Sequence, residues 1–314
     1  MKCTSKRKIA VVGTGAVGAS VAYALSITGL ATELVLVDIN QAKAEGEAMD
    51  LAHAAAFIKP IRIYAGRFED CRECGIIVYT AGVGQKPGET RLELLHRNYD
   101  ILKDSLVRIV GEGHDFILLI VSNPVDVLTY AALKITGLPP EKVFGSGTVL
   151  DSSRFRHALS SHCNVSPRNI HAYVLGEHGD SEVLVWSRVF ISGTGIDQYC
   201  AIAGLPPVNR KEVDRQVRGA AYEIISRKGA TYYAVSLAVK RICESIIRDG
   251  NAILTVSGLV QGAYGISDCC LSMPAVISRK GRGRPLELAL SKNEERALQH
   301  SAEIIKNAID SLKL

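Results

Sequence analysis

The sequence predicts an α/β fold, a doubly wound parallel sheet followed by a second, α+β domain. Short and nearly continuous apolar runs alternate with amphipathic stretches over the first 145 residues, and a glycine-rich turn joins the first run to the first such stretch. The alternation then stops near Gly145. Continuous apolar runs are typical of strands that are buried on both faces. We therefore expect one domain over residues 1–145 and a second over residues 146–314.

In the first half, strand-like runs and helical stretches follow each other in turn. The expected strands are residues 8–12, 33–37, 61–65, 75–80, 116–121 and 142–145. Apolar residues at helical spacing predict helices at 16–27, 41–54, 90–111 and 124–136. Strands that alternate with helices of this length form a parallel sheet in which each helix is a crossover connection.

The second half mixes helices and strands without this alternation. Helices are expected at 149–159, 210–227, 232–248 and 292–312, and strands at 172–175, 182–187, 252–260 and 275–278. The segment Gly204–Pro207 contains two prolines and predicts a surface loop. No low-complexity tract or flexible linker separates the halves, so we expect the two domains to pack closely.

Composition excludes several classes of protein. Of 314 residues, 47% are hydrophobic and 22% charged, which is ordinary for a globular chain. The formal net charge is +5 and basic residues are scattered, which argues against nucleic acid as a partner. Cys71 and Cys74 have a spacing known from redox and zinc sites, but no second ligand pair follows. We therefore expect reduced thiols and no metal.

The N-terminus resembles a secretory leader, because basic residues precede an apolar run at residues 9–30. Four glycines interrupt that run, and a cofactor-binding turn explains them where a cleaved leader does not. No other stretch approaches the length of a membrane span. These observations predict a cytoplasmic protein with no membrane partner.

The glycine-rich turn has the pattern Gly13-x-Gly15-x-x-Gly18, and Asp38 ends the next expected strand. Glycines at this spacing permit a tight turn and a close approach of the backbone to a pyrophosphate at a helix N-terminus. Asp38 is placed to accept hydrogen bonds from ribose hydroxyls, and its charge would repel a 2′-phosphate. The pattern predicts a Rossmann domain that binds NAD in preference to NADP.

Four further motifs lie downstream: Gln85–Arg91, Asn123–Asp126, Asp151–Arg154 and Gly176–Asp180. Taken singly, each has an ordinary structural explanation, such as a surface charge, a helix cap or a loop histidine. No structural need explains all four together after a dinucleotide motif, so their joint occurrence indicates a catalytic site.

With these motifs, the sequence resembles the L-lactate/L-malate dehydrogenase family, and within it the bacterial enzymes that act on L-lactate. The strings AGVGQKPGETR at 81–91 and GEHGD at 176–180 are the most specific, and the resemblance runs from Ile9 into the last helix. It implies an NAD-dependent oxidoreductase that interconverts pyruvate and L-lactate in glycolysis and fermentation.

The resemblance also implies the role of each motif. His178 would be the acid/base, a task that suits a side chain titrating near neutral pH, and Asp151 would orient it. Arg154 would grip the substrate carboxylate, and Arg91, carried on a glycine-rich lid, would polarise the carbonyl. The implied substrate-binding residues are Gln85, Arg91, Asn123, Asp126, Asp151, Arg154 and Thr231. The implied cofactor-binding residues are Gly13, Gly15, Val17, Gly18, Asp38, Lys43, Gly82, Val83, Ser105, Val121, Asn123 and Ser146.

The choice of substrate rests on Gln85. Malate dehydrogenases of this family place an arginine here, which pairs with the second carboxylate of oxaloacetate, whereas a neutral glutamine leaves that carboxylate without a partner. Pyruvate and L-lactate are therefore favoured, and malate dehydrogenase is the first alternative. A non-catalytic NAD-sensing protein is the second, although a sensor has no need of a proton relay.

Two further residues predict regulation. In relatives activated by fructose 1,6-bisphosphate, an arginine and a histidine at the positions of Arg156 and His171 bind phosphate across a subunit interface. Both side chains suit phosphate oxygens, and the alternative is a surface arginine on a helix with a histidine at a strand start. The resemblance therefore implies an allosteric site for this effector and a homotetramer.

Overall fold

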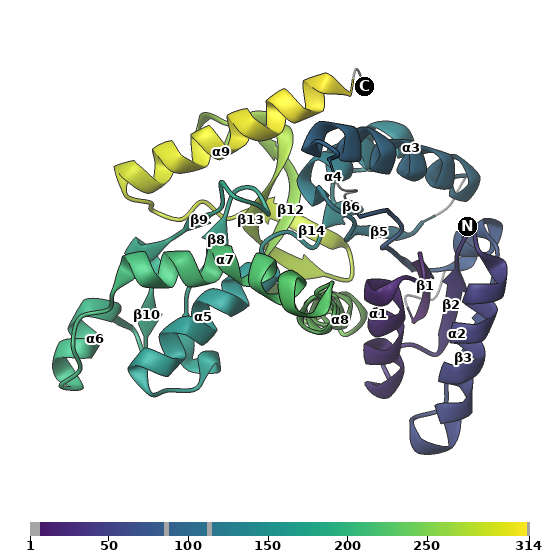
Figure 1. Ribbon diagram of the computed structural model, residues 1–314, viewed down its shortest axis with the longest axis horizontal. Helices are drawn as coiled ribbons and strands as arrows, with labels where there is room; N and C mark the ends of the chain where they lie inside the picture. The colour runs from purple at the N-terminus through teal and green to yellow at the C-terminus, as the bar shows by residue number, and fades with distance from the viewer. Residues whose placement is uncertain (1–6, 85–87, 112–114, 313–314) are drawn as a thin grey trace.

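The computed structural model describes residues 7–84, 88–111 and 115–312. Among these residues the main sheet has nine strands, in the order β14-β13-β12-β6-β5-β4-β1-β2-β3 (Figure 1). Six strands from the first half are parallel: β1 Lys8–Val12, β2 Glu33–Val37, β3 Arg62–Ala65, β4 Ile76–Tyr79, β5 Ile117–Ile120 and β6 Val143–Gly145. This arrangement confirms the predicted doubly wound sheet.

Three antiparallel strands from the second half extend the same sheet: β12 Ala252–Gln261, β13 Ser267–Ser278 and β14 Gly281–Pro285. The junction is narrow, because β12 pairs with β6 only through Ser257 and Gly145. The two halves of the chain therefore share one sheet, and the second half is attached to the first through backbone hydrogen bonds as well as side-chain packing.

Helices cover both faces of the sheet, as the apolar strands require. On β1, Ile9 and Val11 point into the core beside α1 (Ala16–Ile27), α2 (Gln41–His53) and α8 (Tyr233–Ile247). Ala10 and Val12 point the opposite way, into the core beside α3 (Arg91–Ile109), α4 (Val125–Thr136) and α9 (Lys292–Ser311). Alternate residues of one strand thus belong to two separate cores, which is why the sequence shows no polar alternation there.

A third apolar cluster lies away from the main sheet. It joins α5 (Val149–Cys163), α6 (Ile196–Ile202) and α7 (Arg210–Lys228) to two small sheets. One small sheet contains β7 Ile170–His171, β10 Phe190–Ile191 and β11 Thr194–Gly195, and the other contains β8 Val174–Leu175 and β9 Val183–Leu184. This α+β part and α9 hold the loop between β8 and β9, which carries the predicted histidine.

Most predicted boundaries agree with the structure, and the disagreements lie in the second half. Strand β13 begins at Ser267, earlier than expected. The sequence did not reveal this start, because the polar and cysteine residues there hide the strand pattern. Strand β14 and the short elements β7, β10, β11 and α6 were not expected from the sequence. Within the described ranges, no helix is long and apolar enough to cross a membrane.

Candidate active site

The glycine-rich turn between β1 and α1 is closely packed against the end of β4. Gly13 has φ +92°, and a Cβ atom added there would lie 2.5 Å from the backbone nitrogen of Ala81. A Cβ atom at Gly18 would lie 1.8 Å from the carbonyl oxygen of Gly13. Both glycines are therefore required by backbone contacts within the protein itself.

Gly15 differs from these two, because a Cβ atom there would meet no described atom within 4 Å. Its backbone faces open space at the N-terminus of α1, where backbone N–H groups and the helix dipole favour a negative group. The turn therefore offers a cradle that a side chain would fill, and this cradle fits the pyrophosphate of NAD.

Asp38, at the end of β2, is fixed beside this turn. Its Oδ2 accepts hydrogen bonds from the N–H of Thr14 at 2.7 Å and the Thr14 hydroxyl at 3.0 Å, and its Oδ1 accepts from the N–H of Asn40 at 2.9 Å. Burial acts to raise the pKa of Asp38, but these hydrogen bonds outweigh it and hold the pKa below its ordinary value. A cavity of about 630 Å³ adjoins Asp38. An ionised carboxylate therefore lies beside the glycine-rich turn, where it can accept hydrogen bonds from ribose hydroxyls.

The other predicted cofactor residues occupy several places around the carboxyl ends of the parallel strands. Gly82 and Val83 follow β4, Val121 and Asn123 follow β5, and Ser146 follows β6. Val17 lies in the first turn of α1, and Lys43 is exposed in the first turn of α2 near Asp38. Ser105 is different, because it is buried within α3 and its hydroxyl donates to the carbonyl of Ile101.

Asn98 on α3 links two of these segments and was not expected from the sequence. Its side-chain oxygen accepts the N–H of Val83 at 2.8 Å, and its side-chain nitrogen donates to the carbonyl of Asn123 at 2.9 Å. The segments after β4 and β5 are thus held together by one buried amide. A lone asparagine within a helix gives no sequence signal for this task.

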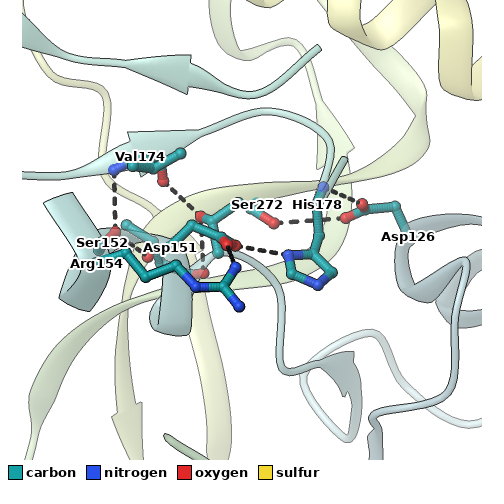
Figure 2. A network of polar contacts seen from close by, with 9 residues as sticks. Asp126, Asp151, Ser152, Arg154, Val174, His178 and Ser272 are labelled. Carbon is teal, nitrogen blue, oxygen red and sulfur yellow. Dashed lines mark hydrogen bonds and ion pairs between the residues drawn. The ribbon is translucent and has the colours of Figure 1, made fainter. Parts of the chain in front are cut away.

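Asp151 lies at the centre of the predicted catalytic residues, between Arg154 and His178 (Figure 2). His178 Nδ1 donates to Oδ2 of Asp151 at 2.6 Å, and Arg154 donates from Nη1 to Oδ1 at 2.7 Å. Asp151 is in the first turn of α5, where the helix dipole favours a carboxylate, and Arg154 follows one turn later on the same face. With its Nδ1 proton held, the imidazole has Nε2 left for a substrate oxygen.

The charges in this cluster shift its acid–base behaviour. Burial alone would lower the pKa of His178, but the carboxylate of Asp151 outweighs burial and raises that pKa to about 9. Burial would raise the pKa of Asp151, yet the neighbouring His178 and Arg154 hold it below its ordinary value. At neutral pH the pair is therefore an imidazolium beside a carboxylate, and His178 has a proton to give.

The loop that carries His178 is anchored from two sides. Asp126 on α4 accepts the backbone N–H of His178 at 2.7 Å through Oδ2. On the other side, Ser301 of α9 accepts the N–H of Glu177 at 2.8 Å, and Gly176 has φ +88° with no room for a side chain next to that serine. Asp126 was expected among the substrate-binding residues. It is 2% exposed, and its carboxylate supports the loop that carries His178.

Arg91 begins α3 and lies on the other side of the same loop. Its guanidinium forms an ion pair with Oδ2 of Asp180 at 2.5 Å and donates to the Tyr222 hydroxyl at 2.8 Å. The Tyr222 hydroxyl in turn donates to Oδ1 of Asp180 at 2.8 Å. The structure thus joins Arg91 to the histidine loop through Asp180 and to α7 through Tyr222, two residues whose contacts the sequence did not predict.

Glu182 follows the histidine loop and is buried beside the catalytic cluster. Its side chain lies within electrostatic range of Asp151, Arg154, His178 and Arg218. Only 4% of the residue is exposed, and its Oε1 has no hydrogen-bond partner among the described residues. Burial first and the charge of Asp151 second raise its pKa to about 8. The carboxyl group is therefore mostly protonated at neutral pH.

The remaining predicted substrate residues are less informative. Thr231 is half-buried in the turn between α7 and α8. Gln85, on which the choice of substrate depends, lies outside the described residues.

The two predicted regulatory residues lie close together. Arg156 on α5 donates from Nε to the carbonyl of Ala172 at 3.0 Å, and Ala172 directly follows His171. The Arg156 guanidinium also lies 5.5 Å from the ring centre of Tyr173. His171 is exposed in β7. Arg156 is thus fixed to the backbone directly after His171.

A cavity of about 1210 Å³ lies elsewhere, at the hairpin between β13 and β14, and no predicted site residue lines it. Cavity size therefore does not locate the catalytic residues. The cavity is lined by the basic residues Lys142, Arg279, Lys280, Arg282 and Arg284. Asp115, Glu141 and Glu287 line the same cavity, so its charge is mixed.

The described cysteines are buried free thiols, including Cys71 and Cys74. No group of three or more histidine, cysteine or acidic side chains among the described residues is arranged to hold a metal ion.

A dinucleotide cradle, an ionised carboxylate at the end of β2, and a protonated histidine held by an aspartate together define a nicotinamide-dependent dehydrogenase. Family comparison agrees over both halves: the lactate/malate dehydrogenase NAD-binding domain matches residues 7–145, and the alpha/beta C-terminal domain of the same family matches residues 148–313. The chain belongs to the lactate/malate dehydrogenase family and is an NAD-dependent oxidoreductase.

Individual relatives are similar over nearly their whole length. An L-lactate dehydrogenase from Thermoanaerobacter sp. is 52% identical, with 98% of this chain and 99% of the relative covered. One from Moorella thermoacetica is 50% identical, with 98% of each covered. The crystal structure of a minor L-lactate dehydrogenase from Enterococcus mundtii in a ligand-bound form has a TM-score of 0.95 at 40% identity, with 99% of each chain covered.

Proposed function

We propose that this dehydrogenase interconverts pyruvate and L-lactate. The observation that carries the proposal is the contact of His178 with Asp151 beside Arg154, because it combines a proton donor with a cation for a carboxylate. The names of the full-length relatives, all L-lactate dehydrogenases, support the same substrate pair. A 2-oxo acid offers the two groups that such a site recognises, a carbonyl oxygen and an adjacent carboxylate.

In this reaction the bound NADH supplies a hydride to the carbonyl carbon. His178 gives its Nε2 proton to the carbonyl oxygen, which becomes the hydroxyl group, and takes that proton back in the reverse direction. Asp151 stays ionised throughout and keeps the Nδ1 proton in place. The raised pKa of His178, about 9, keeps the imidazole protonated at neutral pH.

Arg154 donates a hydrogen bond from Nη1 to Asp151, and we assign its remaining N–H donors to the substrate carboxylate. Arg91 would polarise the carbonyl and stabilise the developing negative charge on its oxygen. To do so it must exchange its contacts with Asp180 and Tyr222 for the substrate, so a lid that carries Arg91 would move during turnover. Asn123 and Thr231 complete the proposed pocket.

A comparison of substrates tests this proposal. NADH oxidation is followed by absorbance with pyruvate, oxaloacetate and a branched 2-oxo acid at matched concentrations. Faster reduction of pyruvate supports L-lactate dehydrogenase activity, and Gln85→Arg is expected to shift preference toward oxaloacetate. Faster reduction of oxaloacetate by the unmodified protein would instead identify a malate dehydrogenase. No oxidation with any substrate would favour an NAD-sensing protein.

We further propose that fructose 1,6-bisphosphate activates the enzyme by binding at Arg156 and His171 in a cytoplasmic homotetramer. The support is their proximity, since Arg156 bonds the residue that follows His171. The test is to titrate pyruvate with and without the bisphosphate and to repeat this with Arg156→Gln, while light scattering follows the oligomeric state. A pyruvate curve that the bisphosphate leaves unchanged at several pH values would reject activation.

We also propose that the chain divides into an NAD-binding domain at 1–145 and a catalytic domain at 146–314. The match to the NAD-binding domain ends at residue 145 and the match to the C-terminal domain begins at residue 148, which supports this boundary.

A further inference from the structure

The buried carboxyl group of Glu182 has no task in the reaction described above. It follows the histidine loop and is 4% exposed, and its Oε1 finds no hydrogen-bond partner in the part of the chain that the structure describes. An ionised carboxylate is costly at such a site unless it is paired and hydrogen-bonded. The protonated form avoids this cost, so the site favours a neutral glutamic acid in the resting protein.

Charged groups from three elements surround this carboxyl. The groups within electrostatic range of it are Asp151 and Arg154 on α5, Arg218 on α7 and His178 on the neighbouring loop. On its own loop, Asp180 is already paired with Arg91, and Glu177 accepts hydrogen bonds from Ser181. While Glu182 is neutral, no second buried carboxylate offsets the positive charges of Arg154 and Arg218. The resulting positive potential attracts the carboxylate of the substrate.

We infer that Glu182 is a positioning residue whose bound proton keeps Arg154 available for the substrate carboxylate, so that loss of this proton weakens substrate binding. An ionised Glu182 adds a second buried negative charge within electrostatic range of Arg154, where it competes with the substrate carboxylate for the charge of that guanidinium. The effect falls on KM and not on kcat, because a substrate that is already bound holds Arg154 itself. This inference rests on the proposed function, since it assigns Arg154 to a carboxylate.

The test is the pH profile of kcat/KM for pyruvate from pH 6.5 to 10.5. In the unmodified enzyme two protons must be bound, one on His178 and one on Glu182, so above both pKa values, about 9 and about 8, kcat/KM falls about 100-fold per pH unit. Glu182→Gln is neutral at all pH values, and its profile falls only about 10-fold per unit. Glu182→Asp keeps an ionisable group and the steeper fall.

Each profile is scaled to its own plateau at low pH, so a general loss of activity does not affect the comparison. Glu223→Gln on the exposed surface of α7 is the matched control and is expected to keep the steeper fall. Equal slopes for the unmodified enzyme and Glu182→Gln would overturn the inference. So would a slope difference that arises from kcat with KM unchanged.

A spectroscopic measurement separates this inference from the proposed function. Infrared difference spectra between pH 7 and 10, recorded without substrate, are expected to show a protonated-carboxyl band that disappears at high pH and is missing in Glu182→Gln. Absence of that band in the unmodified protein overturns the inference even if pyruvate is reduced. Presence of the band without pyruvate reduction would reject the proposed function and the assigned role of Glu182, while leaving its protonation established.

Discussion

The carboxylate of Asp126 accepts the backbone N–H of His178 at 2.7 Å, although the two residues are 52 positions apart in the chain. Asp126 belongs to the first half, on α4, and His178 to the second, on the loop after β8. This bond attaches the proton donor directly to the domain that binds the cofactor. The position of His178 relative to the cofactor-binding half of the chain therefore depends on a buried carboxylate on α4.

Replacement of Asp126 tests this attachment. Asp126→Ala leaves the His178 N–H without its acceptor, which is expected to cost about 1–3 kcal/mol of unfolding free energy. It is also expected to lower kcat by up to about 10²-fold through misplacement of the imidazole, with NADH affinity retained. Asp126→Asn keeps an acceptor oxygen and should lose less of both. Unchanged turnover in Asp126→Ala would show that the bond does not position His178.

The pair His178 and Asp151 predicts a specific pH dependence. Reduction of pyruvate requires protonated His178 and should fall as the pH rises through about 9. Asp151→Asn removes the charge that raises this pKa, so the falling limb should move to lower pH, toward the ordinary 6.5, and kcat should drop about 10²–10⁴-fold. Rate profiles and NMR titration of the imidazole measure both effects. Asp197→Asn, on the surface, is the control and should change neither.

The same pair predicts how stability depends on pH. The folded pKa of His178 is raised, so its protonation stabilises the fold below the unfolded value, 6.5, and this contribution is lost as the pH rises through about 9. Asp151→Asn should therefore lose most stability near pH 6 and approach the unmodified protein above pH 9. A stability difference that stays constant between these pH values would contradict the assignment. Chemical denaturation at a series of pH values provides the measurement.

Two glycines of the nucleotide turn should respond differently to the same substitution. Gly18→Ala places a Cβ atom 1.8 Å from the Gly13 carbonyl oxygen, so the protein should lose about 1–3 kcal/mol or more of stability. Gly15→Ala meets no atom within 4 Å, so the fold should be unaffected while NADH affinity falls, because the methyl group enters the cradle. Thermal unfolding and NADH fluorescence titration distinguish the two effects. An unchanged NADH affinity in Gly15→Ala would place the pyrophosphate elsewhere.

Arg282 on β14 is expected to destabilise the protein. It is 6% exposed, donates from Nη1 to the carbonyl of Leu259, and has no partner for Nε and Nη2 among the described residues. Burial lowers the pKa of Arg282 to about 10. Arg282→Leu removes an incompletely paired buried charge and should stabilise the fold by about 1–3 kcal/mol. Denaturant unfolding measures this, with the exposed Arg215→Leu as the control. A loss of stability would show that the guanidinium has a structural or ligand-binding task.

The sequence predicted the parallel sheet accurately because each of its strands is buried on both faces, and such strands must be apolar throughout. It failed at β14, where Gly281–Pro285 contains two arginines and two glycines and no apolar pattern. That segment is a strand because the neighbouring β13 offers it backbone hydrogen bonds. The short strands β7, β10 and β11 were missed for a similar reason, since two residues are too few to show a period.

The joint occurrence of the motifs, and the family resemblance that they carry, predicted Asp151, Arg154 and His178. They did not reveal the residues that hold these side chains in place. Asn98, Ser301 and Glu182 act through contacts with distant segments, and an asparagine, a serine or a glutamate in isolation is unremarkable. Only the folded chain shows which of them meet the site.

The sequence by itself determined the class of fold and the dinucleotide turn, because hydrophobic period and glycine spacing are local properties, and it predicted the proton donor through the family resemblance of its motifs. The tertiary structure decided that Asp126 supports His178 from a buried position, that Arg91 contacts Asp180 and Tyr222, and that Glu182 is buried within electrostatic range of four charged residues. Burial and electrostatic environment set the pKa of a side chain, and both depend on segments that are far apart in the chain. The sequence around a residue therefore gives its chemical type but not its pKa.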